Sequence, residues 1–283
     1  MHAQYAPVSN QTQFSSLPDG VTLMQASFTD HAFERHSHDC FALGMTTYGV
    51  QRFRCKGKQY ASQVGDFVLF NPDEDHDGSR GTPDGFRYTI WYLPESFVDT
   101  CKDLDAGLAG KPYFQAPHTT DRRLASVFVR LSQSLLTTPS ESLRAETMMR
   151  TFVGQMLSRH GERPVPAAAF RQPNTAHLGW VKDYIQANFQ RDLTVAELAD
   201  IAGLSRAHFT RAFTAAFHSP PHVYLNTVRI MQAQTFMRLG MPLATVAVEC
   251  GFADQSHFNR RFKGSVGASP AGWLQMTGRT SLA

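Results

Sequence analysis

The sequence predicts a multidomain chain of mixed α and β structure, with an N-terminal β-barrel, a helical hairpin and a C-terminal domain built from helices alone. Three observations carry this prediction. Short aromatic and β-branched runs separated by glycine turns fill the first 120 residues, apolar stripes at helical spacing follow, and the last third contains an internal repeat. A chain of 283 residues also exceeds one ordinary core, so more than one domain is expected.

Composition limits the class of protein before any motif is considered. Hydrophobic residues make up 42% of the chain and charged residues 18%, which is ordinary for a globular protein. No run approaches the ~18 apolar residues of a membrane helix, and the first residues lack the basic start and apolar core of a signal peptide. The four cysteines lie far apart, without a Cys-x-x-Cys pair: Cys40, Cys55, Cys101 and Cys250. We therefore expect a cytoplasmic protein with no membrane partner.

The positive charge lies at the C-terminal end. Residues 177–283 contain ten Lys and Arg against six Asp and Glu, a net charge of +4, whereas residues 1–176 contain seventeen against eighteen, a net charge of −1. This distribution favours a polyanionic partner for the last third of the chain.

Residues 1–120 are expected to form the barrel. The candidate strands are FALGMTTY (41–48), VQRFRC (50–55), KQYASQV (58–64), FVLFN (67–71) and FRYTIWYL (86–93). Small turns containing glycine separate them, a pattern typical of a sandwich or barrel.

The last of these strands carries candidate ligand contacts. Alternation places Arg87, Thr89 and Trp91 on one face. A guanidinium, a hydroxyl and an indole converging inside a barrel would suit a small polar or anionic metabolite, so we expect these residues to bind an effector. The alternative is that Trp91 belongs to the core and Arg87 is a charge at the rim.

Residues 121–160 predict a hairpin of two amphipathic helices. Leu124, Phe128, Leu131 and Leu135 follow the helical spacing of the first, and a second is expected from Glu141 to His160, with Met149, Phe152 and Met156 on one face. We expect this segment to mediate a homodimer; packing of both stripes onto the barrel is the alternative. Residues 161–176, rich in Pro and Ala, are expected to be an interdomain linker.

An internal repeat begins after residue 177. HFTRAF (208–213) recurs as HFNRRF (257–262), 49 positions later, and ADIAG (199–203) is echoed by AVECG (247–251), 48 positions later. Each copy reads as helix, glycine turn and helix, so residues 177–283 are expected to contain two helix-turn-helix motifs. Thr194, Ser205 and Asp254 are placed to cap helices, and Gly203 permits the positive φ of the turn.

Two such motifs on the basic part of the chain predict binding to double-stranded DNA. The expected DNA-contacting residues are the outward positions of the two second helices: Ala207, Thr210, Arg211, Gln255, Ser256, His257, Asn259, Arg260, Arg261 and Lys263. Within this set we expect Arg211 and Arg260 to read bases, and Arg261 or Lys263 to contact phosphate.

The stretch from Tyr184 to Trp273, about a third of the chain, closely resembles the DNA-binding domain of the AraC/XylS family of bacterial transcription regulators. The resemblance rests on LTVAELADIAGLS (193–205), SPPHVYL (219–225), Arg229, GMPLATVAVECGFADQSHFNRRFK (240–263) and GASP (267–270). It implies seven helices in two subdomains joined by a long helix near 221–239, with two recognition helices entering successive major grooves. It also implies an activator that contacts RNA polymerase.

Residues 30–94 resemble, less specifically, the cupin-type ligand-binding domain common in these regulators. His36, His38 and His76 fall where cupins place their motifs. Metal-binding cupins have a glutamate shortly after the second histidine, but here those positions are Ala42, Leu43 and Gly44. We therefore expect no metal and no cofactor, and we expect the three histidines to bind the effector or to hold the barrel mouth together.

The chain is thus expected to be an effector-responsive transcription regulator and not an enzyme. Three alternatives stay open from the sequence. The imidazoles could hold Fe, Mn, Ni or Zn; a cupin oxygenase or isomerase could be fused to a DNA-binding tail; and the protein could be an architectural DNA binder that responds to no ligand.

Overall fold

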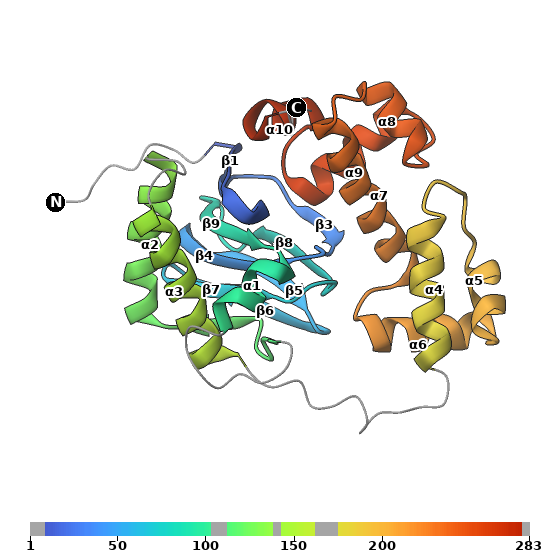
Figure 1. The fold of residues 1–283 in the computed structure, drawn as a ribbon, viewed down its shortest axis with the longest axis horizontal. Coiled ribbons are helices and arrows are strands. Elements are labelled where there is room, and N and C mark those ends of the chain that lie inside the picture. The colour runs from blue at the N-terminus through green and yellow to red at the C-terminus, as the bar shows by residue number, and fades with distance from the viewer. Residues whose placement is uncertain (1–8, 103–111, 138–142, 162–174, 279–283) are drawn as a thin grey trace. The chain divides into compact units, whose positions relative to one another are not determined.

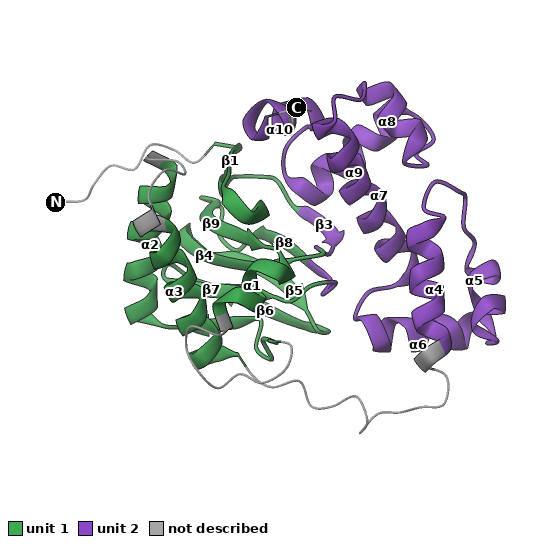
Figure 2. Cartoon of the chain, viewed as in Figure 1, with its two compact units in different colours: residues 1–32, 39–72, 77–164 green, residues 33–38, 73–76, 165–283 purple. Residues whose placement is uncertain are grey.

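The computed structural model describes residues 9–102, 112–137, 143–161 and 175–278. The chain divides into two compact units (Figure 2). Unit 1 comprises residues 1–32, 39–72 and 77–164, and unit 2 comprises residues 33–38, 73–76 and 165–283. Most of the expected linker, residues 162–174, lies outside the described residues.

The strands of the described residues form two sheets (Figure 1). An antiparallel six-stranded sheet has the order β1 (Gln11–Ser16), β2 (Thr22–Phe28), β9 (Phe86–Leu93), β4 (Phe41–Gly49), β7 (Asp66–Phe70) and β10 (His118–Thr120). A four-stranded sheet has the order β3 (Phe33–His36), β8 (His76–Arg80), β5 (Gln51–Cys55) and β6 (Lys58–Ser62). The five predicted strands all form, and the structure adds β1, β2, β3, β8 and β10, together with the short 3-10 helix Pro18–Gly20.

In the inner strands of the six-stranded sheet, both faces are mostly apolar and buried. Successive side chains of a strand point to opposite faces, so neighbours such as Val68 and Leu69 belong to two different apolar layers. On one face, Phe70 meets Phe53 of β5 edge to face, with ring centroids 5.4 Å apart. Beside them the buried hydroxyls of Thr46 and Ser62 are hydrogen bonded at 2.7 Å. That face packs against the second sheet.

Gly49 makes the corner at which the chain leaves the six-stranded sheet and enters the four-stranded one. Its φ is +67°, and a Cβ there would lie 2.1 Å from the carbonyl oxygen of Gly85. A residue without a side chain is therefore required for both the backbone conformation and the close approach.

Helices cover the other face of the six-stranded sheet (Figure 1). These are α2 (Arg122–Thr137) and α3 (Leu143–His160), with α1 (Glu95–Lys102) beside them. The predicted apolar stripes form one continuous core with the sheet residues on this face; the helical members are Leu124, Phe128, Leu131, Leu135, Met149, Phe152 and Met156. The stripes thus pack onto the sheet, which is the alternative to an exposed dimerisation surface. In the described part of these helices, Val129 and Met148 remain as exposed large apolar side chains.

Seven helices follow within residues 175–278, as the resemblance implies. They are α4 (Thr175–Ala187), α5 (Val195–Ala202), α6 (Arg206–Phe217), α7 (Pro221–Arg238), α8 (Leu243–Glu249), α9 (Gln255–Val266) and α10 (Pro270–Thr277). The pairs α5–α6 and α8–α9 are the two helix-turn-helix motifs, and α7 is the long helix between them. None of the described helices is long and apolar enough to cross a membrane.

The predicted caps and turns of these motifs are confirmed. The side chains of Thr194, Ser205 and Asp254 each accept a hydrogen bond from the backbone N–H three residues later, at 3.1, 3.4 and 2.7 Å. Gly203 and Gly251, in the two turns, have φ values of +65° and +74°. Local sequence signals therefore set where the helices of each motif begin and how the chain turns between them.

The two turn glycines predict a matched pair of variants. Alanine at a left-handed position costs about 1–2 kcal/mol of stability. At Gly203 an added Cβ meets nothing within 4 Å, whereas at Gly251 it would lie 2.5 Å from the carbonyl oxygen of Gln190. We expect Gly203→Ala to cost about 1 kcal/mol and Gly251→Ala about 1–3 kcal/mol more, because the second change adds overpacking. Hydrogen exchange of peptides from residues 175–278 measures both losses, and equal losses would contradict the packing argument.

Candidate functional site

The first recognition helix, α6, presents the residues expected from the sequence. Ala207 and Arg211 are exposed and Thr210 is half-buried, while Phe209 and Phe213 lie fully in the core. The Thr210 hydroxyl donates to the backbone carbonyl of Arg206 at 2.9 Å. In this rotamer the side chain of Thr210 therefore offers a partner only its methyl group and the lone pairs of its hydroxyl oxygen.

The second recognition helix, α9, presents a more polar surface. Gln255, Ser256, Asn259, Arg260 and Lys263 are exposed, and His257 and Arg261 are half-buried. His257 packs edge to face on Phe252, with ring centroids 5.6 Å apart. Arg261 donates to Glu34, in the same compact unit, at 2.7 Å. Five of the seven predicted residues of α9 are thus exposed, while contact with DNA stays a prediction.

The chemistry of these two faces fits the edges and backbone of a nucleic acid. Neither recognition helix contains an acidic residue, and their exposed cations include Arg211, Arg260 and Lys263. Arginine can donate two hydrogen bonds to a guanine edge, and asparagine or glutamine can pair with adenine. The pattern of cations with amides at helix surface positions is what sequence-reading helices use.

Arg229, on α7, joins the two motifs. Its Nε donates to the carbonyl oxygen of Phe189 at 2.8 Å and its Nη2 to that of Arg191 at 2.9 Å, both in the connection between α4 and α5. The guanidinium also lies 5.9 Å from the ring centroid of Phe252, just after the turn of the second motif. One buried cation thus donates hydrogen bonds to two carbonyls of the connection that leads into the first motif, and it also contacts the second motif.

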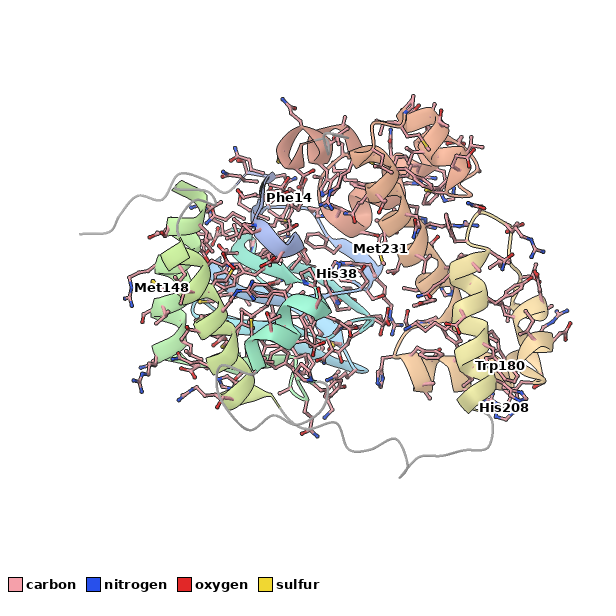
Figure 3. The ribbon with its side chains drawn as sticks, viewed as in Figure 1. Phe14, His38, Met148, Trp180, His208 and Met231 are labelled. Atoms are coloured by element: carbon pink, nitrogen blue, oxygen red, sulfur yellow. The ribbon has the colours of Figure 1, made fainter. Side chains whose placement is uncertain are left out.

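The structure brings the three predicted histidines together. His36 lies at the end of β3 and His76 at the start of β8; Figure 3 marks the third, His38. Their ligand atoms all lie within 4.8 Å of one another, and the ring centroids are 4.6 to 5.2 Å apart. Burial, followed by the neighbouring imidazoles, holds the pKa of His38 well below its usual value, and burial with His36 does the same for the pKa of His76.

Arg87, Thr89 and Trp91 share one face of β9, as expected, but their surroundings differ. Trp91 is fully buried in the core between the six-stranded sheet and α2 and α3, and its indole N–H donates to Ser132 Oγ at 3.0 Å. Thr89 accepts from Gln25 Nε2 at 3.4 Å, and Arg87 lies 5.3 Å from the ring centroid of Tyr48. Trp91 therefore belongs to the core, which is the alternative that the sequence left open, while effector contact by Arg87 and Thr89 stays a prediction.

The opposite face of the same strand was not expected to form part of the site. Tyr88, Ile90 and Tyr92 alternate with the expected residues and point toward the second sheet. Burial raises the pKa of Tyr88 well above its usual value, and burial with the neighbouring Cys40 raises that of Tyr92. These are two neutral phenols inside the fold. The alternation shows that two faces exist, but only the position of the covering helices shows which one is internal.

Two family models match the chain. One, described as an AraC-like ligand binding domain, matches residues 20–153. The other, described as a helix-turn-helix domain, matches residues 198–276. The first covers β2 to β10, α1, α2 and part of α3, and the second runs from within α5 to within α10.

Relatives match over most of the chain. The uncharacterized HTH-type transcriptional regulator YbfI of Bacillus subtilis is 25% identical over 226 residues, which cover 80% of this chain and 81% of YbfI. The arabinose operon regulatory protein of Escherichia coli is 22% identical over 237 residues, covering 82% of this chain and 79% of that protein. Among solved structures, apo ToxT of Vibrio cholerae has the same fold, with a TM-score of 0.61 and 13% identity over 93% of this chain and 100% of ToxT.

The contacts of Arg229 predict a specific loss of stability. Arg229→Met keeps the length of the side chain but leaves the carbonyls of Phe189 and Arg191 without their donor, which costs about 1–3 kcal/mol. Arg238→Met is the matched control on the same helix, where the guanidinium lies 5.0 Å from the ring centroid of Trp273, a contact worth about 0.5–1 kcal/mol. Hydrogen exchange should show faster opening of the α4–α5 connection in the first variant alone. The same protection in both variants would contradict the role assigned to Arg229.

Proposed function

This chain belongs to the AraC family of bacterial transcription regulators, and we propose that it binds specific DNA sequences. A small-molecule effector in its N-terminal domain controls this binding or the activation that follows. The observation that carries the proposal is the pair of helix-turn-helix motifs, whose second helices expose cationic and amide side chains. The match of residues 20–153 to a ligand-binding domain supports the effector.

The two recognition helices are proposed to read one asymmetric site. Their exposed residues differ, so the two halves of the site need not be related by symmetry. On one face of B-DNA, such motifs contact major-groove segments about one turn apart, ~34 Å or ~10 bp. Arg211 and Arg260 would each pair with a guanine edge, and Ala207 would contact only apolar groups such as a thymine methyl.

The effector is proposed to be a small polar or anionic metabolite. His36, His38 and His76 supply a polar cluster for it, and Arg87 and Thr89 remain candidates at the sheet. Trp91 is not proposed as an effector contact, because its ring lies within the hydrophobic core.

The remaining assignments rest on the family. We propose a barrel domain at residues 1–120, a helical hairpin at 121–160, a linker at 161–176 and a DNA-binding domain at 177–283. We also propose that the protein acts in the cytoplasm, activates transcription through RNA polymerase and is not an enzyme. These proposals extend the two domain matches, which supply the ligand-binding and DNA-binding parts.

Base reading and phosphate contact predict different behaviour in binding experiments. Arg211→Ala and Arg260→Ala should each cost about 1–3 kcal/mol and relax the preference at one base pair, in different halves of the site. Lys263→Ala should weaken binding to all sequences and lower the salt dependence by about one unit, because it removes a phosphate contact. The measurement is quantitative binding to a panel of single-base operator variants at several salt concentrations. A uniform loss for both arginine variants would make them backbone anchors and contradict the assignment.

The homodimer has a separate test. The stripes of α2 and α3 are used within the chain, so a dimer through residues 121–160 must use their outer faces, where Val129 and Met148 are exposed. We expect light scattering to show a dimer at tens of micromolar, and Met148→Lys to shift it toward the monomer by placing a charge in the interface. A monomer with and without DNA would contradict the proposed dimer but not the DNA-binding function.

A further inference from the structure

We propose that a pocket between α2 and α3 binds the phosphate group of a small metabolite. The pocket has a volume of about 230 Å³ and is lined by Arg123 and Leu124, near the start of α2, and by Gln155 and Arg159, near the end of α3. All four residues belong to unit 1, whereas the three histidines described above belong to unit 2. The inference therefore goes beyond the proposed function, which assigns no small molecule to these helices.

The helical hairpin brings the four side chains together. The two helices lie side by side (Figure 1), with Leu124 of α2 and Met156 of α3 in the same hydrophobic core. Gln155 and Arg159 are four residues apart, so they lie on one face of α3, one turn from each other. The start of α2 thus meets the end of α3, and cationic side chains from both helices line the same pocket.

Asp121 fixes this junction. Its Oδ1 accepts a hydrogen bond from the backbone N–H of Leu124 at 3.1 Å, and its Oδ2 accepts from Arg159 Nε at 2.8 Å and from His160 Nε2 at 3.0 Å. Burial acts to raise the pKa of Asp121, but these hydrogen bonds outweigh it and lower the pKa to about 2. The carboxylate is therefore charged at pH 7 and acts as a positioning residue for the guanidinium of Arg159.

Hydrogen-bond donors remain for an anionic ligand. A guanidinium has five N–H groups, so Arg159 can use the four on its Nη atoms while Nε donates to Asp121. The exposed guanidinium of Arg123 and the exposed amide of Gln155 add donors from both helices. Arginine donates in pairs to phosphate oxygens, which suits a pocket that has one guanidinium from each helix.

The charge at the pocket favours phosphate over a single carboxylate. Arg122, Arg123 and Arg159 carry three formal positive charges against the one negative charge of Asp121, a net charge of +2. A phosphate monoester carries about −1.5 to −2 at pH 7 and matches this charge, whereas a carboxylate carries a single negative charge. Helix α2 contains no acidic residue, and the partial positive charge of its N-terminus also favours an anion.

The size of the pocket limits the ligand. Pockets for drug-sized molecules usually have volumes of about 300–1,000 Å³, so a volume of about 230 Å³ suits a small phosphate ester. The polar lining would take the phosphate group, and Leu124 can contact the carbon atoms of the ester. Inorganic phosphate and glycerol 3-phosphate are therefore the probes. Succinate is the comparison, because it carries its negative charge on two separate groups.

The test follows the pocket directly. Full-length protein with isotope-labelled leucine methyl groups is titrated with each probe at constant ionic strength, and the NMR signals of Leu124 report occupancy. We expect one saturable site for both phosphates and none for succinate. Arg123→Gln should weaken the affinity about tenfold or more, since it removes hydrogen bonds to a charged group. Arg130→Gln, which removes an exposed arginine of the same helix outside the pocket lining, is the control and should bind like the wild type.

A second pair of variants separates the pocket from the general charge of the surface. Gln155→Glu places a negative charge among the lining residues and should prevent saturation by either phosphate. Ser158→Glu places the same charge on an exposed position of α3 outside the lining and should leave binding unchanged. All four substituted positions are exposed, so the variants should fold, and thermal unfolding checks this.

Three results would overturn the proposal. The first is the absence of any shift of the Leu124 signals with either phosphate. The second is binding of succinate as tight as that of glycerol 3-phosphate, which would make the pocket a carboxylate site. The third is an equal loss of affinity in each variant and its control, which would mean that phosphate responds only to surface charge.

Discussion

The buried guanidinium of Arg229 is the interaction on which the DNA-binding half depends. A buried cation is costly unless hydrogen bonds satisfy it, and here the carbonyls of Phe189 and Arg191 accept from it while Phe252 lies against its face. Close packing surrounds this point, since a Cβ on Gly251 would lie 3.0 Å from Arg229 Nη2. Arg229 on the central helix α7 thus contacts both the connection between α4 and α5, which leads into the first motif, and the segment just after the turn of the second motif. The spacing of the two reading faces follows from this junction.

The C-terminal half could be predicted from sequence because its signals are local. Thr194, Ser205 and Asp254 cap helices within their own neighbourhoods, and Gly203 turns the chain by its own backbone freedom. The internal repeat then showed that two similar units exist. The role of Arg229 was not predictable in the same way, because its hydrogen-bond partners lie 38 and 40 residues away in sequence. A single arginine in a helix does not indicate which distant residues it contacts.

The N-terminal half was predicted less well, because its decisive contacts are non-local. The period of two in β9 was found correctly, but both of its faces are apolar and buried, so the pattern does not tell which side is internal. The helices that cover Trp91 begin about thirty residues further on, at Arg122. The three histidines were identified as a group through the resemblance. The carbonyl contacts of His36 and His76, which fix their tautomers, appear only in the structure.

The unequal chemistry of the two recognition helices has a consequence for how binding sites in a genome would look. The α6 face carries a methyl group at Ala207 and a Thr210 hydroxyl that already donates to its own helix, so Arg211 is the principal reader under the proposed function. The α9 face exposes several amide and cationic side chains. Under the proposed function, information about base identity would therefore be divided unevenly between the two helices. An alignment of the natural target promoters would show one conserved segment, the α9 box, where α9 contacts the DNA. A helical turn away, the segment contacted by α6 would vary more in sequence. New promoters could then come under this regulator chiefly by acquiring the α9 box.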